Sequence, residues 1–174
     1  MCIRDSPNSK IPAITDPVGN HGKPLHIMES GAILLYLAEK TGLFISQDAV
    51  KRSQEIQWLF WQMGGLGPMF GQFGHFTVYA DQKHDLSYGQ ERYKNEAIRL
   101  LNVLDQQLSS RHYVAGDTLS IADFSILPWI VGLDTFYHAR DYLGLDHFNH
   151  INRWTAELLS RPAVQKGMNI CKIR

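Results

Sequence analysis

The sequence predicts a mostly helical protein with a small β part at its N-terminal end. Short β-like runs and turn residues fill the stretch "KIPAITDPVGNHGKPLHIM" at residues 10–28. From about residue 48 onward, long segments repeat apolar residues at the helical spacing. A chain of 174 residues can form one core or two small cores packed together. We therefore expect a partial β and helix domain at residues 1–43 and an all-helical domain at residues 48–174.

The N-terminal part is expected to be a hairpin followed by one helix. "KIPAITD" is a β-like run broken by Pro12, "PVGNHGKP" is dense in turn formers, and "LHIM" resumes an extended pattern. The following "ESGAILLYLAEKTG" has apolar residues at helical spacing and stops at Gly42, which suits the left-handed position after a helix. This helix is expected to pack on one face, through Ile33, Leu34, Leu37 and Ala38.

Three further segments favour long helices. "AVKRSQEIQWLFWQM" is rich in large aromatic residues and runs into "GGLGP", where the glycines and Pro68 are expected to break or bend it. "ERYKNEAIRLLNVLDQQL" has apolar residues on one side and charges on the other, which is typical of an amphipathic helix. A last helix, with Ile151, Trp154 and Leu158 on one side, is expected to end at Arg161–Pro162.

The stretch "GDTLSIADFSILPWIVGL" predicts the start of a buried helix. Ser120 can cap it, and Asp123 stands at the third helical position, where it can bond back to the cap. A catalytic role for Asp123 is the alternative, but capping already accounts for the residue. Removing its carboxylate is therefore expected to destabilise the fold without touching a reaction centre.

A carboxylate and a hydroxyl, Glu29 and Ser30, stand at the start of the first helix and allow two interpretations. Their side chains can cap the helix, because acidic and hydroxyl groups pair with its free N–H groups. Alternatively, the same N–H groups can hold the carboxylate of a ligand. From this stretch alone capping is favoured.

Composition argues against several classes of function. Basic and acidic residues both total 17, so the net charge offers no attraction to nucleic acid or to an anionic membrane. No apolar run approaches the roughly 20 residues that span a bilayer, and the N-terminal residues lack the apolar stretch typical of a secretory signal. Cys2 and Cys171 form no CxxC motif, and the eight histidines include no HExxH motif. We expect a cytoplasmic protein without a metal site.

The order of these segments resembles the glutathione transferase family. The resemblance rests on "KIPAI" and "ESGAILLYLAEKTG", followed by "SIADFSILPW", and it covers residues 7–170. "QWLFWQMGGLGPMFGQ" and "ERYKNEAIRLLNVLD" are most similar to the bacterial Nu-class, whose members act as glutathione-dependent disulfide-bond reductases. The resemblance implies a glutathione transferase fold, with a truncated thioredoxin-like domain ahead of the all-α domain.

The resemblance also implies a glutathione site. Ser30 and its backbone N–H would take the carboxylate of the γ-glutamyl end, while Glu29 would face the ammonium, so that capping and ligand binding share one site. Pro12 matches the cis-proline of the family, which turns the backbone of Ile11 toward the cysteinyl part of glutathione. Arg92 matches a basic residue that contacts glutathione, although it is equally placed to pair with Glu96 on an exposed helix face.

One part of the family pattern has no match in this sequence. The family begins with a β-α-β unit that holds the Tyr, Ser, Thr or Asn side chain stabilising the glutathione thiolate, whereas "MCIRDS" matches nothing in the family. We therefore expect a truncated chain, and no catalytic residue is assigned within it.

The function implied by the resemblance is glutathione-dependent reduction of a small disulfide, or conjugation to an electrophile, by the complete form, as a homodimer. The alternative is a folded, non-enzymatic binding or regulatory module, because the fold alone does not determine the function.

Overall fold

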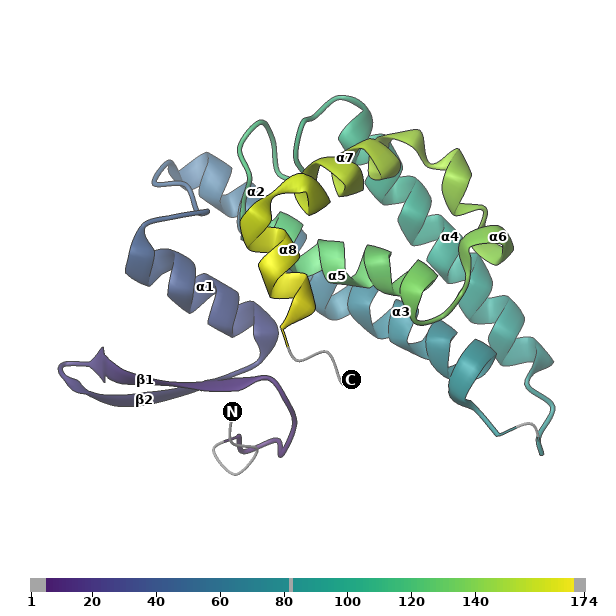
Figure 1. The fold of residues 1–174 in the computed structure, drawn as a ribbon, viewed down its shortest axis with the longest axis horizontal. Coiled ribbons are helices and arrows are strands. Elements are labelled where there is room, and N and C mark those ends of the chain that lie inside the picture. The colour runs from purple at the N-terminus through teal and green to yellow at the C-terminus, as the bar shows by residue number, and fades with distance from the viewer. Residues whose placement is uncertain (1–5, 82, 171–174) are drawn as a thin grey trace.

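The computed structural model describes residues 6–81 and 83–170, so Cys2 and Cys171 lie outside the described residues. The helices and strands follow the expected order, with a two-stranded hairpin first and helices after it (Figure 1). Their bounds are β1 Ala13–Asn20, β2 Lys23–Met28, α1 Ser30–Thr41, α2 Ala49–Trp61, α3 Gly67–Gly74, α4 Ser87–Ser109, α5 Ile121–Thr135, α6 Arg140–Leu143, α7 Asn149–Ser160 and α8 Pro162–Asn169.

The predicted hairpin is confirmed, but its turn is tighter than the sequence suggests. β1 and β2 pair antiparallel, with Ala13 opposite Met28 at the open end. The turn is formed by His21 and Gly22, whose φ angles of 49° and 80° are both positive. Two positive φ angles match the right-handed twist of hairpin strands. β1 can continue through Pro17 because the strand register shifts between Asp16 and Asn20, so the proline lies at an irregularity of the ladder.

α1 joins the hairpin to the helices. Its expected end at Gly42 is confirmed, because Gly42 has a left-handed φ of 69° and donates to the carbonyl of Ala38. Figure 1 shows α1 between the hairpin on one side and the other helices on the opposite side. Ala38 belongs to a small core with Ile45, Leu59 and Ile121, so α1 is fixed to α2 and α5. The division of the chain into two domains stays a prediction.

The glycine-rich segment after α2 bends the helix without breaking it. Gln62–Leu66 form a π-helical turn that continues directly into α3, and Gly67 N donates to the carbonyl of Gln62. Pro68 lacks an N–H and would interrupt the ordinary ladder. Pro68 stands in the first turn of α3, directly after the π-helical turn, where a missing N–H is tolerated.

The main core lies between α3, α4, α5 and α7. The predicted apolar face of α4 is confirmed, since its residues Ala97, Leu100, Leu101, Leu104 and Leu108 are buried. Trp154 of α7 is fully buried in the same core, with Phe70 and Phe73 of α3. This core rigidly positions α5, against which α1 rests.

The end of the chain departs from the prediction. α7 ends before Arg161, as expected, but it is not the last helix of the described residues because α8 begins at Pro162. The residue before a proline is disfavoured in a helix, whereas proline itself is favoured at the first helical position. Pro162 therefore ends one helix and starts the next.

The capping role predicted for Asp123 is confirmed, and its carboxylate also accepts two hydrogen bonds that the sequence did not predict. Asp123 Oδ2 accepts from the backbone N of Ser120 at 3.0 Å, and Ser120 Oγ accepts from Ala122 N at 3.3 Å. Asp123 Oδ1 also accepts from Val114 N and from Trp154 Nε1, both at 2.9 Å. Burial raises the pKa of the Asp123 carboxyl, and these hydrogen bonds oppose that shift. One carboxylate thus ties α5 to the preceding loop and to α7.

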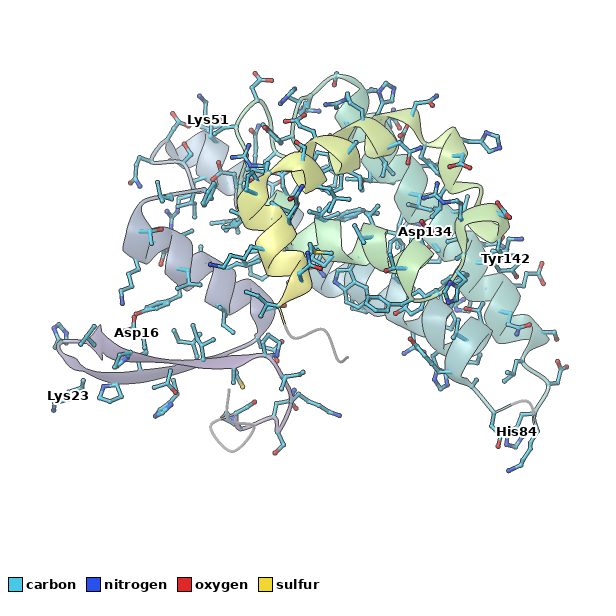
Figure 2. All side chains as sticks on the ribbon, viewed as in Figure 1. Asp16, Lys23, Lys51, His84, Asp134 and Tyr142 are labelled. Carbon is cyan, nitrogen blue, oxygen red and sulfur yellow. The ribbon has the colours of Figure 1, made fainter. Side chains whose placement is uncertain are left out.

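A second carboxylate, Asp16, ties the hairpin to α1. Asp16 Oδ2 accepts from the Tyr36 hydroxyl at 2.7 Å and pairs with Lys40. Figure 2 labels Asp16 on the side of the hairpin that faces α1. The pKa of Asp16 is lowered to about 2, first by the hydrogen bond from Lys40 and then by that from Tyr36. The contact therefore depends on the ionised form.

Asp16→Asn is expected to loosen the hairpin. Because the pKa of Asp16 in the folded protein lies below its ordinary value of 3.8, the contact stabilises the hairpin fully above about pH 4 and loses this effect as the pH falls toward 2. Amide protection factors of β1 and β2 should therefore be lower in the variant than in the parent at pH 5, and this difference should shrink as the pH falls to 2 and below. Asp81→Asn, in an exposed loop, is the matched control. Equal protection of Asp16→Asn and parent at pH 5 would contradict the role given to Asp16.

Candidate functional site

The open end of the hairpin and the start of α1 meet at one place. Ala13 pairs with Met28, so the next residues outward, Pro12 and Glu29, lie at the same end of the hairpin. The peptide bond between Ile11 and Pro12 is cis, as the family resemblance implied. Ile11 is 65% exposed, and among the described residues its backbone N–H and C=O make no hydrogen bond. This leaves the backbone N–H and C=O of Ile11 unpaired at the end of the hairpin where α1 starts.

The start of α1 is uncapped by side chains, which corrects one expectation. Neither Glu29 nor Ser30 caps the helix, since the N-cap residue Glu29 makes no side-chain cap hydrogen bond. The reason lies in the backbone: an N-cap side chain reaches back from an extended residue of negative φ, whereas Glu29 has a φ of 69°. Positive φ is uncommon outside glycine, and such strained positions gather at functional sites.

The backbone amides at this helix start are available to a ligand. Ile33 N donates to the carbonyl of Glu29, which closes the first helical hydrogen bond. Within the described part of the chain, nothing accepts from the amides of Ser30, Gly31 and Ala32. Free amides and the positive end of the helix dipole together favour an anion.

The Ser30 hydroxyl has an unusual partner. It donates to the thioether sulfur of Met63 at 3.8 Å. Met63 comes from the π-helical turn that follows α2, so it reaches α1 from the other part of the chain. Sequence reasoning missed this residue, and the glycines and Pro68 around it were the available signal of an irregular turn.

Arg92 is not brought to this helix start by any contact that the structure shows. It lies exposed on α4, and the pairing with Glu96 that the sequence allows is made by Arg99 instead, at 2.7 Å. Arg92 lines a separate groove of about 400 Å³ with Tyr93 and Asn95. Its place in the site therefore stays a prediction.

Another groove, of about 490 Å³, lies between the α1–α2 linker and the α4–α5 loop. Buried Glu55 and exposed Lys51 line it, and neither Glu29 nor Ser30 belongs to it. The helix start is an open surface site by contrast, where a ligand would lie across the end of the hairpin.

This arrangement suits a ligand with an amino-acid end and an extended peptide part. The free amides of α1 and the Ser30 hydroxyl can bind a carboxylate, and the neighbouring Glu29 carboxylate can pair with an ammonium group. The free backbone at Ile11 can pair with a peptide as an added strand does.

Comparison with known proteins identifies the family of this chain. Residues 68–162 match the family described as glutathione S-transferase, C-terminal domain. The chain is 46% identical over 167 residues to the disulfide-bond oxidoreductase YghU of Escherichia coli, and 44% identical over 167 residues to the disulfide-bond oxidoreductase YfcG of the same species. The chain belongs to the glutathione transferase family.

A solved glutathione transferase shares the fold. The enzyme of Burkholderia graminis, crystallised with two glutathione molecules bound per subunit, superposes with a TM-score of 0.94 at 46% identity, covering 99% of this chain and 72% of that one. The matches to YghU and YfcG cover 95% of this chain, but only 57% of the length of YghU and 74% of the length of YfcG. The expected glutathione transferase fold is thereby confirmed.

The described residues lack two kinds of feature. Residues 6–81 and 83–170 contain no helix long and apolar enough to cross a membrane. The same residues contain no cluster of three or more His, Cys, Asp or Glu side chains suited to a metal ion.

Proposed function

We propose that the complete form of this protein uses glutathione to reduce small disulfides, and that this chain supplies the binding site for the γ-glutamyl end. This proposal rests on the start of α1, which no side chain caps. There the free amides and the Ser30 hydroxyl lie next to Glu29 in the chain. The γ-glutamyl end of glutathione carries the matching pair of charges, an α-carboxylate and an α-ammonium.

The two relatives named as disulfide-bond oxidoreductases support disulfide reduction over other reactions of the family. A glutathione thiolate attacks one sulfur of the disulfide, releases the first thiol and leaves a mixed disulfide. A second glutathione thiolate attacks the glutathione sulfur of that mixed disulfide, which yields glutathione disulfide and the second thiol. Two glutathione molecules are consumed, and the Burkholderia graminis enzyme binds two per subunit.

The site residues have proposed roles. Ser30 and the amides after it bind the γ-glutamyl carboxylate, Glu29 binds the ammonium, and Ile11, turned outward before cis-Pro12, pairs with the cysteinyl backbone. Arg92 is proposed as a further contact to glutathione, from its own subunit or from the second subunit of a homodimer. The group that stabilises the thiolate is expected on the β-α-β unit that precedes these strands in the family.

A chimaera tests the activity. Residues 7–174 are joined to the N-terminal β-α-β unit of YfcG, and glutathione-dependent reduction of a small disulfide is followed through the glutathione disulfide formed. We expect turnover, and we expect Ser30→Ala in the chimaera to reduce it. A folded chimaera that binds glutathione without reducing disulfides or conjugating electrophiles would overturn the proposal and favour the non-enzymatic module. The second substrate, the homodimer and a cytoplasmic location remain part of the proposal, the dimer being tested by sedimentation of the chimaera.

A further inference from the structure

The contact between Ser30 and Met63 links the candidate glutathione site to the helical part of the chain. The Ser30 hydroxyl donates to Met63 Sδ at 3.8 Å. The sulfur also lies directly against the next residue, because a Cβ atom added to Gly31 would come within 2.9 Å of it. Only glycine lets the first turn of α1 approach the thioether this closely, so both Ser30 and Gly31 rest on one side chain.

The π-helical turn determines where Met63 lies. Its five residues, Gln62–Leu66, are wound more widely than the helices on either side, and they shift the side chains out of the ordinary helical register. Met63 is half-buried and packs with Leu34 and Leu35 of α1 against the small core. Its position is therefore set by packing, independently of any ligand.

The chemistry of the acceptor matters because a ligand must compete with it. A thioether is a weak hydrogen-bond acceptor, so it can orient the Ser30 hydroxyl at little cost to later binding. A carboxylate is a much stronger acceptor and takes the same hydrogen when it arrives. A hydroxyl that is already oriented and held near the free amides loses less freedom on binding, which raises affinity.

We propose that Met63 is a positioning residue for the γ-glutamyl carboxylate of glutathione, acting through the Ser30 hydroxyl. The inference rests on the proposed function, because it concerns the same site. It adds a residue from the helical part of the chain that does not itself touch the ligand.

The test measures glutathione binding to the full 174-residue chain by NMR titration. Three proteins are compared: the parent, Met63→Leu and a control variant. Leu keeps the volume and apolar character of Met but removes the acceptor, so the fold should be kept. Met168→Leu, a half-buried methionine of α8, is the matched control. The second ligand is 4-aminobutanoyl-Cys-Gly, which is glutathione without the α-carboxylate.

We expect Met63→Leu to weaken glutathione binding by about two- to tenfold, because the ligand must then order a hydroxyl that is no longer held near the free amides. Binding of 4-aminobutanoyl-Cys-Gly should be unchanged, as should binding of both ligands to Met168→Leu. In the Ser30→Ala background the same Met63 change should have no further effect, because the hydroxyl it positions is gone.

Two results would overturn the inference in distinguishable ways. If the parent chain binds no glutathione at this helix start, the proposed function fails and the role of Met63 fails with it. If the parent binds but Met63→Leu binds glutathione as tightly as the parent, or weakens both ligands equally, the site stands and Met63 has no positioning role.

Discussion

Asp123→Ala is expected to lower the free energy of unfolding by roughly 3 to 5 kcal/mol. Asp123 is fully buried and accepts from Val114 N, from the N and Oγ of Ser120 and from Trp154 Nε1. Alanine would leave the Trp154 and Val114 donors without a partner inside the core, and each such donor costs on the order of 1 to 3 kcal/mol. Urea denaturation followed by tryptophan fluorescence measures the loss.

The matched comparison is Asp123→Asn, which keeps the size of the side chain. The amide oxygen of asparagine can still accept the hydrogen bonds from Val114 N and Trp154 Nε1. Its NH₂ group cannot accept those from the N and Oγ of Ser120. An intermediate loss is expected. A loss below about 1 kcal/mol for Asp123→Ala, no larger than an average surface change, would show that this carboxylate does not hold α5 to α7.

Ser30→Ala is expected to separate binding from stability. Because the hydroxyl makes no cap hydrogen bond, its removal should change the free energy of unfolding by no more than about 0.5 kcal/mol. Glutathione affinity should fall about tenfold or more, since a hydrogen bond to a charged group is lost. Calorimetric or NMR titration gives the affinity, and urea denaturation gives the stability.

The control for Ser30→Ala is Ser53→Ala, which removes an exposed hydroxyl from α2. It should change neither quantity. If Ser30→Ala instead lost stability at unchanged affinity, the residue would be a structural cap in solution, as the capping interpretation of the sequence holds.

The sequence predicted the helices well where one face of the helix is buried in the core. The apolar spacing of α4 and the cap before α5 are local patterns, and burial followed them. Pro162 misled the prediction because one proline can both end a helix and start another. The π-helical turn could be foreseen as an irregularity, but its form depends on how α2 and α3 pack on α5.

The candidate site was predictable only in part. Sequence reasoning placed Ile11, Pro12, Glu29 and Ser30 near the helix start, and the hairpin register does so in the structure. The positive φ of Glu29 has no local sequence signal, so the absence of capping could not be foreseen. Met63 lies 33 residues from Ser30, and such a contact arises from tertiary packing alone.

The most direct test of a glutathione site at the start of α1 is an amide NMR titration of the full chain with glutathione. The largest shifts should fall at Ile11 and at Ser30, Gly31 and Ala32, whose amides are free. Shifts confined to the linker groove at residues 42–46, or no shifts at millimolar glutathione, would contradict the account.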